Sequence, residues 1–434
     1  MSVLTLANAR LIDPEAGTET PGWLRIEDGR ISARGTDAPG GGGAAGETVD
    51  CRGHCLAPGI VDIGVKIGEP GERHKESFRT AGLAAAAGGV TTIVMRADTA
   101  PAIDTPETLA FVLNRAREEA RVRVHPMAAL TKGRRGAEMT EIGFLLDAGA
   151  VAFSDGDAVC ADNRVLARAL SYAAAMGALV IGHVQDPGLS AGAAVTAGKF
   201  ASLRGLPGVS PMAERMGLER DLALVEMTGA RYHADQITTA AALPALARAR
   251  AAGLDVSAGV SIHHLTLNEL DVGDYRTFFK VKPPLRSEDD RRAVVAAVAE
   301  GEIEVICSMH TPQDEESKRL PFEEAASGAV ALETLLPAAL RLVHGGDLGL
   351  PALFAALSLN PARRLGLEGG RLAVGAPADL VLFDADAPFV LDRFSLRSKS
   401  KNTPFDEARM QGRVLATWVA GERVYGRAGN AAGD

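Results

Sequence analysis

The residues of this chain that could do chemistry are a few histidines and acids, and the chemistry would be metal-assisted hydrolysis. His183 lies in the segment 182–186, His310 follows the apolar run 305–307, and Asp155 follows Phe153. A catalytic zinc ion usually takes three protein ligands and keeps one position open for water. His183, His310 and one acid are therefore the smallest set that could hold a single metal ion.

Two other patterns have simpler explanations. Cys51 and Cys55 could be half of a metal site, but no second pair completes it, so buried thiols are the better interpretation. The pair Arg134-Arg135 is short and has neutral neighbours, which predicts a solvated surface. The glycine run 40–43 is predicted to be a loop and not a phosphate cradle, because no helix with Lys-Ser/Thr follows it.

The elements that must position these side chains alternate along the middle of the chain. Between about 58 and 365, strand-like runs alternate with helical segments rich in Ala, Leu and Arg, such as 108–113, 240–252 and 291–300. The last two are each followed by an apolar strand, at 256–258 and 305–307. This alternation predicts a (β/α)₈ barrel, whose working groups lie at the carboxyl ends of its strands. A doubly wound sheet is the competing fold, but no Gly-x-Gly-x-x-Gly follows an early strand.

The apolar run 56–71, LAPGIVDIGVKIGEPG, is predicted to be a buried strand that ends in a loop at the barrel mouth. With the following His-Lys-Glu at 74–76 and AAAAGGVTT at 84–92, the chain resembles the class I dihydroorotases of the amidohydrolase superfamily. The resemblance covers essentially the whole chain. It implies an α/β fold with a (β/α)₈ barrel at 58–365 and a composite β-sandwich domain formed by 1–57 and 366–434.

The resemblance also implies a zinc site whose residues have changed. In that family, histidines, acids and a catalytic aspartate at the strand ends hold two zinc ions. The matching positions of this chain are Gly64, Lys66, Asp155, His183, Gln236 and Met309. A thioether at position 309 neither accepts a proton from water nor binds zinc as a hard ligand. Only one acid of the family's pair persists in Phe153–Asp157, and which of the two positions would bind the metal stays open.

The family's substrate pocket has changed too. Gly68 stands in place of an arginine, and Asp98 and Lys282 stand in place of asparagines, while His310 is retained. Without the arginine, a substrate carboxylate has no bidentate partner, and an acid at 98 would repel it. By the same resemblance, His233 and the pair His263-His264 are structural.

Lys66 and Lys282 suggest how the altered site is balanced. If both project into the former metal cavity, their ammonium groups replace charge lost with zinc and pair with Asp98, Asp155 or Asp62, because unpaired buried carboxylates are costly. The alternative is that both lysines extend to solvent at the surface.

Bulk properties narrow the class of protein. The 434 residues carry a net charge of −9 with no basic block, so nucleic acid is not an expected partner. The start of the chain shows no signal peptide, and no run of about 20 apolar residues suggests a membrane span. A cytoplasmic protein without membrane association is expected.

The function implied by the resemblance is that of a pseudo-dihydroorotase. The chain resembles the non-catalytic dihydroorotase-like chain that accompanies aspartate transcarbamoylase in some bacteria. This implies an aspartate transcarbamoylase catalytic chain as partner, a homodimer as building block, and no cofactor. The alternative is an active cyclic amide hydrolase, either with one zinc ion bound by His183, an acid and His310, or without metal through Lys66.

Overall fold

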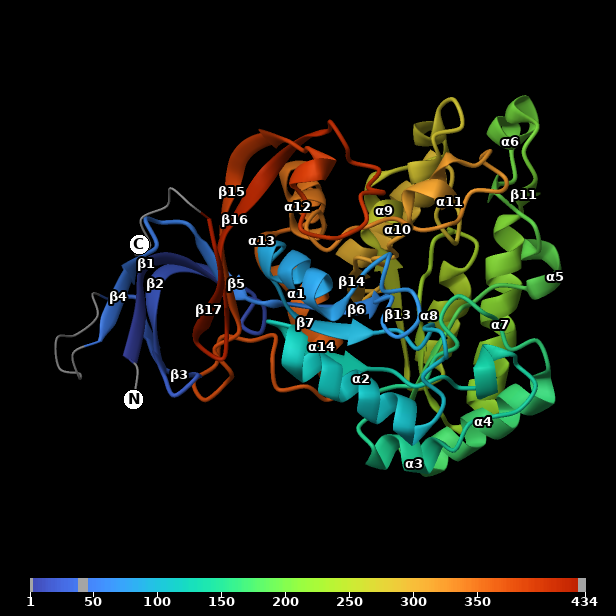
Figure 1. Cartoon of the computed structure of the whole chain (residues 1–434), viewed down its shortest axis with the longest axis horizontal. Coiled ribbons are helices and arrows are strands. Elements are labelled where there is room, and N and C mark those ends of the chain that lie inside the picture. The colour runs from blue at the N-terminus through green and yellow to red at the C-terminus, as the bar shows by residue number, and fades with distance from the viewer. Residues whose placement is uncertain (1–2, 38–45, 428–434) are drawn as a thin grey trace.

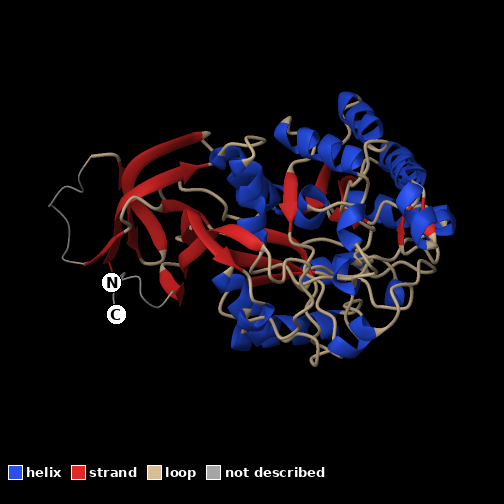
Figure 2. Ribbon diagram, turned by 90° about the horizontal axis from the view of Figure 1, so that it is seen from above, coloured by secondary structure: helices blue, strands red, loops and turns tan. Residues whose placement is uncertain are grey.

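The computed structural model describes residues 3–37 and 46–427. The glycine run at 40–43, predicted to be a loop, lies outside the described residues. Figure 1 shows a β-sheet domain on the left and a larger α/β domain on the right. Seen from above, in Figure 2, strands gather at one end, while helices surround the strands of the larger domain.

The sheet domain is one eight-stranded sheet made from both ends of the chain. Its strands follow the order β17-β16-β15-β5-β1-β2-β3, and β4 pairs with β1 in parallel. Strand β5 joins the two ends because it pairs with β1 on one side and with β15 on the other. The strands are β1 (Val3–Asp13), β2 (Thr18–Glu27), β3 (Arg30–Gly35), β4 (Glu47–Asp50), β5 (Cys55–Pro58), β15 (Leu380–Val390), β16 (Arg409–Val419) and β17 (Glu422–Gly426).

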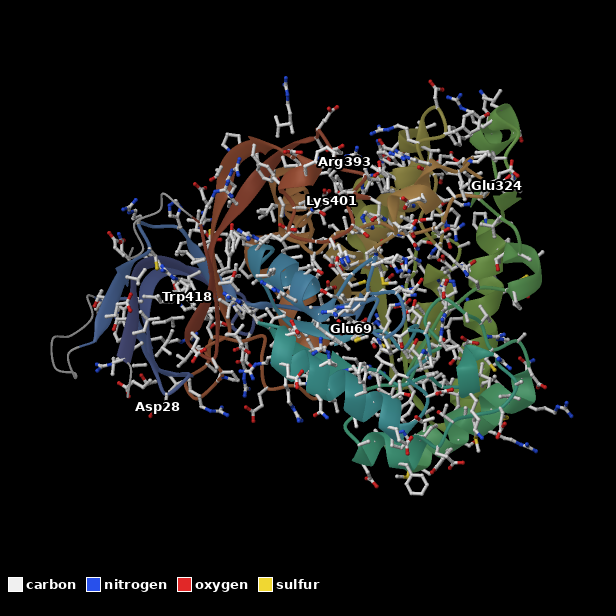
Figure 3. The ribbon with its side chains drawn as sticks, in the orientation of Figure 1. Asp28, Glu69, Glu324, Arg393, Lys401 and Trp418 are labelled. Atoms are coloured by element: carbon white, nitrogen blue, oxygen red, sulfur yellow. The ribbon has the colours of Figure 1, made fainter. Side chains whose placement is uncertain are left out.

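The sheet encloses its own apolar core because its strands alternate inward and outward side chains. In β2, Leu24 and Ile26 are buried while the residues between them are only partly covered. These side chains belong to one cluster with Leu56 from β5, Leu380 from β15 and Trp418 from β16. Trp418 is labelled within this sheet in Figure 3.

The larger domain is a barrel of parallel strands. The bonded groups are β6-β7-β8 and β9-β12-β13-β14, and Phe153 links them through single bridges to Ala128 and Val180. Around the barrel, the Lys66 amide donates to the His310 carbonyl (2.9 Å) and joins the first strand to the last. The strands are β6 (Ile60–Val65), β7 (Val90–Met95), β8 (Arg123–Pro126), β9 (Leu179–Gly182), β12 (Arg231–Ala234), β13 (Val256–Ser261) and β14 (Val305–Cys307).

Helices follow the strands, as expected for βα units. The main ones are α1 (Phe78–Ala87), α2 (Pro106–Glu119), α3 (Ile142–Asp147), α4 (Asn163–Ala175), α7 (Pro211–Thr228), α8 (Leu243–Ala251), α10 (Glu288–Ala299) and α12 (Leu335–His344). The helical segments predicted at 108–113, 240–252 and 291–300 are confirmed by α2, α8 and α10. Shorter helices are α5 (Pro187–Ser190), α6 (Lys199–Arg204), α9 (Ile262–Thr266), α11 (Glu315–Arg319), α13 (Leu350–Phe354) and α14 (Asn360–Leu365), and β10 (Val195–Thr196) pairs with β11 (Gly208–Val209).

The fold class is confirmed, with one correction at the first strand. The apolar run predicted to be a single strand is divided at Gly59, so that β5 belongs to the sheet and β6 to the barrel. A β-carbon built on Gly59 would lie 2.2 Å from the Thr91 side chain, so only glycine fits this junction. Among the described helices, none combines the length and apolarity that crossing a membrane requires.

Candidate functional site

The predicted site residues meet at the barrel mouth, the end where the barrel strands finish. Gly64 lies at the end of β6, Lys66 directly follows it, and Asp98 follows β7. His183 follows β9, and Gln236 follows β12. Met309 and His310 follow β14, next to β6. Because the strands are parallel and closed into a barrel, these segments converge although they are far apart in the sequence.

Met309 fills the space beside Gly64. A β-carbon built on Gly64 would lie 2.6 Å from the Met309 sulfur, which is closer than two such atoms approach. Gly64 has φ +97° and Met309 has φ +47°, so both backbones adopt a left-handed conformation. The thioether therefore occupies the volume into which a side chain at position 64 would extend.

Lys66 lies inside the mouth and is ion-paired. Its Nζ lies 2.9 Å from Glu72 Oε2 and 3.6 Å from Asp98 Oδ2, and the side chain is largely covered. The predicted pairing of Lys66 with Asp98 is therefore present. Asp98 also accepts a hydrogen bond from Arg96 Nη2 (2.9 Å), so this buried carboxylate lies between two cations. Two cations beside one buried acid remove the penalty of an uncompensated charge.

Arginine side chains occupy the next part of the mouth, at Gly156. A β-carbon built on Gly156 would lie 3.3 Å from Arg96 Nη2 and 3.4 Å from Arg134 Nη2. This is the position where the family's second acid is missing, and guanidinium groups have taken the space. The expectation that Arg134 lies on a solvated surface is wrong, because its Nη2 bonds Asp157 Oδ1 at 2.6 Å.

Asp157 is the acid of the 153–157 segment that faces the mouth. Lys282 Nζ lies 3.4 Å from its Oδ2, and Arg96 lies 3.9 Å from its Oδ1. Burial raises the pKa of Asp157, but the charges of Arg96, Lys282 and Arg134 outweigh it and hold the pKa well below its usual value. Lys282 therefore pairs with an acid that the sequence analysis had not named as its partner.

Asp155 and Asp62 do not pair with lysine, which corrects the expectation for these two acids. Asp155 accepts hydrogen bonds from the Thr131 amide (2.9 Å) and hydroxyl (2.6 Å) and holds that loop in place. Asp62 accepts from the Ser308 amide (2.8 Å), and burial raises its pKa to about 6. Both acids are buried structural groups.

His183 and its neighbours form the inner wall of the mouth. His183 is buried, and its Nε2 has no hydrogen-bond partner among the described residues. Burial, with the charge of Lys282, lowers the pKa of His183 to about 3, so the ring is neutral at pH 7. Gln236 donates to the Lys282 carbonyl (3.3 Å), and burial raises the pKa of its neighbour Asp235 to about 6.

His310 is not directed at the other predicted ligands. Its Nδ1 accepts the amides of Ala331 (3.1 Å) and Leu332 (3.4 Å), which leaves the proton on Nε2, 3.3 Å from Glu76 Oε2. Glu76 also accepts from the Lys399 amide (3.1 Å), in the segment between β15 and β16. His310 therefore connects the barrel to the C-terminal segment, and both of its nitrogens are in use.

His233 and the pair His263-His264 have structural partners. His233 Nδ1 bonds Ser257 Oγ at 2.8 Å. His264 bonds Ser261 Oγ (2.7 Å) and the Pro283 carbonyl (3.1 Å). The His263 ring stacks on Phe405, with the ring centres 6.0 Å apart.

These residues do not fit a zinc ion. Across residues 3–37 and 46–427, no three His, Cys, Asp or Glu side chains are placed to share one metal. The mouth offers a glycine, an ammonium, an amide and a thioether where the family's ligands and base would be. Catalytic zinc needs three nitrogen, oxygen or thiolate donors. Gly68 adds no anion-binding group, because a β-carbon there would lie 2.3 Å from the Glu72 carbonyl oxygen.

Four further residues belong to the site although the sequence did not single them out: Arg96, Arg134, Asp157 and Asp235. A usable signal existed for Arg96, which directly follows the wholly buried strand β7. A charged residue at the carboxyl end of a buried parallel strand points to the mouth of a barrel. Arg134 comes from a loop and carries no such signal.

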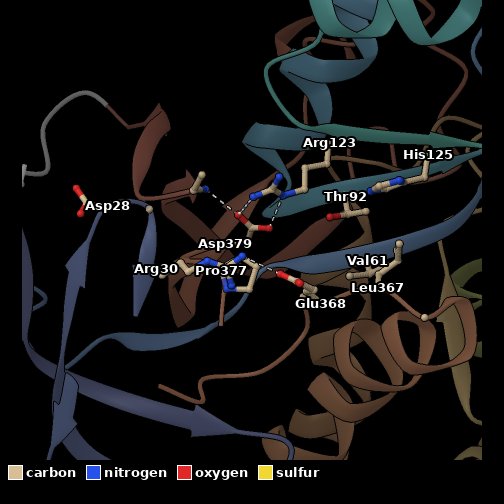
Figure 4. Close-up of a pocket in the computed structure, with 14 residues that line it drawn as sticks. Asp28, Arg30, Val61, Thr92, Arg123, His125, Leu367, Glu368, Pro377 and Asp379 are labelled. Atoms are coloured by element: carbon tan, nitrogen blue, oxygen red, sulfur yellow. Dashed lines mark hydrogen bonds and ion pairs between the residues drawn. The ribbon is translucent and has the colours of Figure 1, made fainter. Parts of the chain in front are cut away.

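A separate cavity of about 410 Å³ lies at the opposite end of the barrel, against the sheet domain (Figure 4). Both of its arginines are paired with acids. Arg123 makes two hydrogen bonds to Asp379 (2.7 and 3.1 Å), and Arg30 bonds Glu368 at 3.0 Å. The Arg123–Asp379 pair connects the barrel to the sheet domain, and the Arg30–Glu368 pair lies within the sheet domain, so the cavity is a feature of the domain junction.

Comparisons with known proteins agree with this scaffold. A profile described as "Dihydro-orotase-like" matches residues 53–242, and one described as "Amidohydrolase family" matches 339–425. The L-hydantoinase (dihydropyrimidinase) of Arthrobacter aurescens has a similar structure, with a TM-score of 0.87 and 25% identity over 98% of this chain and 96% of that one.

Full-length relatives carry two kinds of name. A "dihydroorotase-like protein" of Pseudomonas putida is 41% identical over 98% of this chain and 99% of its own length. A "dihydroorotase" of Wolbachia (subspecies Drosophila simulans) is 37% identical over 97% of this chain and 95% of its own length. At this identity and coverage, the chain belongs to the dihydroorotase-like family of the amidohydrolase superfamily.

Proposed function

We propose that this chain is a pseudo-dihydroorotase, a catalytically inactive member of its family that supports the assembly or activity of aspartate transcarbamoylase. The observation that carries the proposal is the contact between Met309 and Gly64. The residue at the position of the family's catalytic aspartate is a thioether, and its sulfur fills the space of a zinc-binding histidine. Loss of a general base alone typically lowers a rate by about 10²–10⁴-fold.

The charges of the barrel mouth support the same proposal. Lys66 and Arg96 both contact Asp98, while Arg134 and Lys282 contact Asp157. Cations fixed by acids occupy the region in which a hydrolytic site would hold zinc and water. Lys66 is held by ion pairs to Glu72 and Asp98, which does not favour a metal-free reaction through this residue.

The assembly role rests on the resemblance and on which parts of the molecule are retained. The barrel and the sheet domain match those of full-length relatives, although the hydrolytic residues have changed. A scaffold kept without its active site is what a subunit with a structural role requires. The proposed partner is an aspartate transcarbamoylase catalytic chain, and the proposed building block is a homodimer.

The test combines metal analysis, dihydroorotate turnover and transcarbamoylase activity. Purified protein is supplied with zinc, dialysed, and assayed alone and with an aspartate transcarbamoylase chain, with an active dihydroorotase as positive control. We expect no stoichiometric zinc and no turnover, and transcarbamoylase activity that rises when the chains are mixed. Stoichiometric zinc with turnover would instead identify an active cyclic amidohydrolase.

One variant tests whether the chain has lost only the catalytic base or the whole metal site. Met309→Asp restores the family's carboxylate but not the histidines missing at 64, 66 and 236. We expect this variant to remain without zinc and without turnover. Activity in Met309→Asp would show that only the base had been lost, which contradicts the proposed replacement of the site.

A further inference from the structure

A second cleft, of about 460 Å³, lies between the sheet domain and the barrel and is lined by other residues than the barrel mouth. The strands β15 and β16 lie beside helix α12 there, as Figure 1 shows. Three arginines line the cleft from separate segments. Arg397 comes from the connection between β15 and β16, Arg413 from β16, and Arg427 from the residue after β17.

Within the described residues, none of the three guanidinium groups forms an ion pair, although the charge of Arg397 acts on Glu333 from a greater distance. No carboxylate lies within 4 Å of them, although most other arginines of the barrel and sheet form such pairs. Aromatic rings hold two of them in position. Arg413 lies 4.3 Å from the ring centre of Phe389, and Arg397 lies 5.5 Å from that of Tyr425. A guanidinium stacked on a ring keeps its in-plane N–H groups free to donate.

The two acids on the cleft wall are already bonded to backbone amides. Glu333 accepts the amides of Arg397 (2.5 Å) and Ser398 (3.1 Å), and Asp392 accepts that of Phe394 (2.9 Å). Burial raises the pKa of Glu333 to about 7, so its negative charge is incomplete at neutral pH. The cleft therefore has an excess of positive charge.

Arg413 and Arg427 are close enough to repel each other. Burial and the charge of Arg427 both lower the pKa of Arg413. Two like charges that interact in this way are unfavourable unless an anion lies between them. This pair of arginines is what we expect of an anion-binding site without its ligand.

We propose that this cleft binds a small phosphorylated molecule. The planar fork of a guanidinium matches two oxygens of a phosphate group, and three guanidiniums that line one cleft suit an anion with several such oxygens. The cleft volume lies in the range of small-molecule sites. The proposal is independent of the hydrolytic site, because none of the three arginines reaches the barrel mouth.

The test uses pyrophosphate as the probe, with binding measured by calorimetry on the full chain. The variant Arg413→Gln/Arg427→Gln is compared with Arg168→Gln/Arg371→Gln, which removes the same charge from two exposed arginines. We expect the wild type and the control to bind alike, and the cleft variant to bind at least about tenfold more weakly, since charge-assisted hydrogen bonds are lost. Equal binding by both variants, or no binding by the wild type, would overturn the proposal.

Two further binding measurements, one with a single variant and one with a different anion, test the same cleft. Arg427→Gln alone changes an exposed side chain beyond the last strand, so it tests the cleft even if the double variant fails to fold. Succinate, which carries two carboxylates, serves as the competing anion class. Tighter binding of succinate than of pyrophosphate would contradict a phosphate site, and tighter pyrophosphate binding would support it.

Discussion

Removing Arg96 should destabilise the barrel, because this cation compensates buried acids. Arg96 is only 7% exposed and its partner Asp98 only 4%. Breaking a buried ion pair by removing one partner typically costs about 3–5 kcal/mol. Lys66 remains 3.6 Å from Asp98, so we expect Arg96→Met to lower the free energy of unfolding by about 3 kcal/mol, the low end of that range.

Urea unfolding followed by circular dichroism measures this effect. The exposed variant Arg168→Met is the control, and Arg96→Met/Asp98→Asn removes both partners. Because paired removal leaves no uncompensated charge, the double variant should recover more than half of the loss. A cost below about 1 kcal/mol for Arg96→Met, or a double variant as unstable as the sum of the two single variants, would refute the reasoning.

The loss of unfolding free energy caused by Arg96→Met should also depend on pH, because Arg96 lowers the pKa of Asp235. Burial already raises the pKa of this acid to about 6, and Arg96 opposes that rise. Without Arg96 the folded-state pKa moves further above the unfolded value, so the folded protein binds more protons than the unfolded chain. The penalty of Arg96→Met should be largest above pH 7 and should shrink as the pH falls toward 5. A penalty that grows on acidification would contradict this assignment.

Three further predictions concern the mouth. Gly64→His should lower the thermal midpoint more than Gly177→His, because overpacking against Met309 costs about 1–3 kcal/mol of stability. Gly177 is the control because it also has a positive φ but has nothing within 4 Å. Equal losses in the two variants would contradict the contact. Zinc or EDTA should leave the midpoint of the wild type unchanged, since a metal that bound the folded state would raise it. His183 should stay neutral by NMR down to pH 5, and because its pKa is lowered to about 3, stability should fall as the pH drops below about 6.5. His183→Gln should reduce that fall, and an unchanged pH profile would contradict it.

Much of the fold could be predicted because its patterns are local. The helices at 108–113, 240–252 and 291–300 and the strands at 256–258 and 305–307 follow from periodicity and composition. The junction at Gly59 could not be predicted in this way. The chain passes from the sheet domain to the barrel inside a continuous apolar run. The boundary at Gly59 is apparent only from the close contact with Thr91.

The site was only partly predictable, because its groups gain their roles from partners far away in sequence. The replacement residues Gly64, Lys66 and Met309 are visible in the sequence, but the contact between Gly64 and Met309 is not. Arg134 looked like a surface residue, since nothing near it in sequence is the acid with which it pairs. From the sequence, His310 was a possible metal ligand. In the structure, its Nε2 bonds Glu76 and its Nδ1 accepts the Ala331 amide.

The sequence by itself determined the family, the barrel and the identity of the groups that replaced a hydrolytic site, because these follow from residue type and local order. The tertiary structure alone decided which cation pairs with which acid, and that three arginines with no ion pair among the described residues line a second cleft. Both depend on distances between loops that the parallel strands and the shared sheet bring together. Coulombic and packing energies fall steeply with distance, so these pairings exist only in the folded chain.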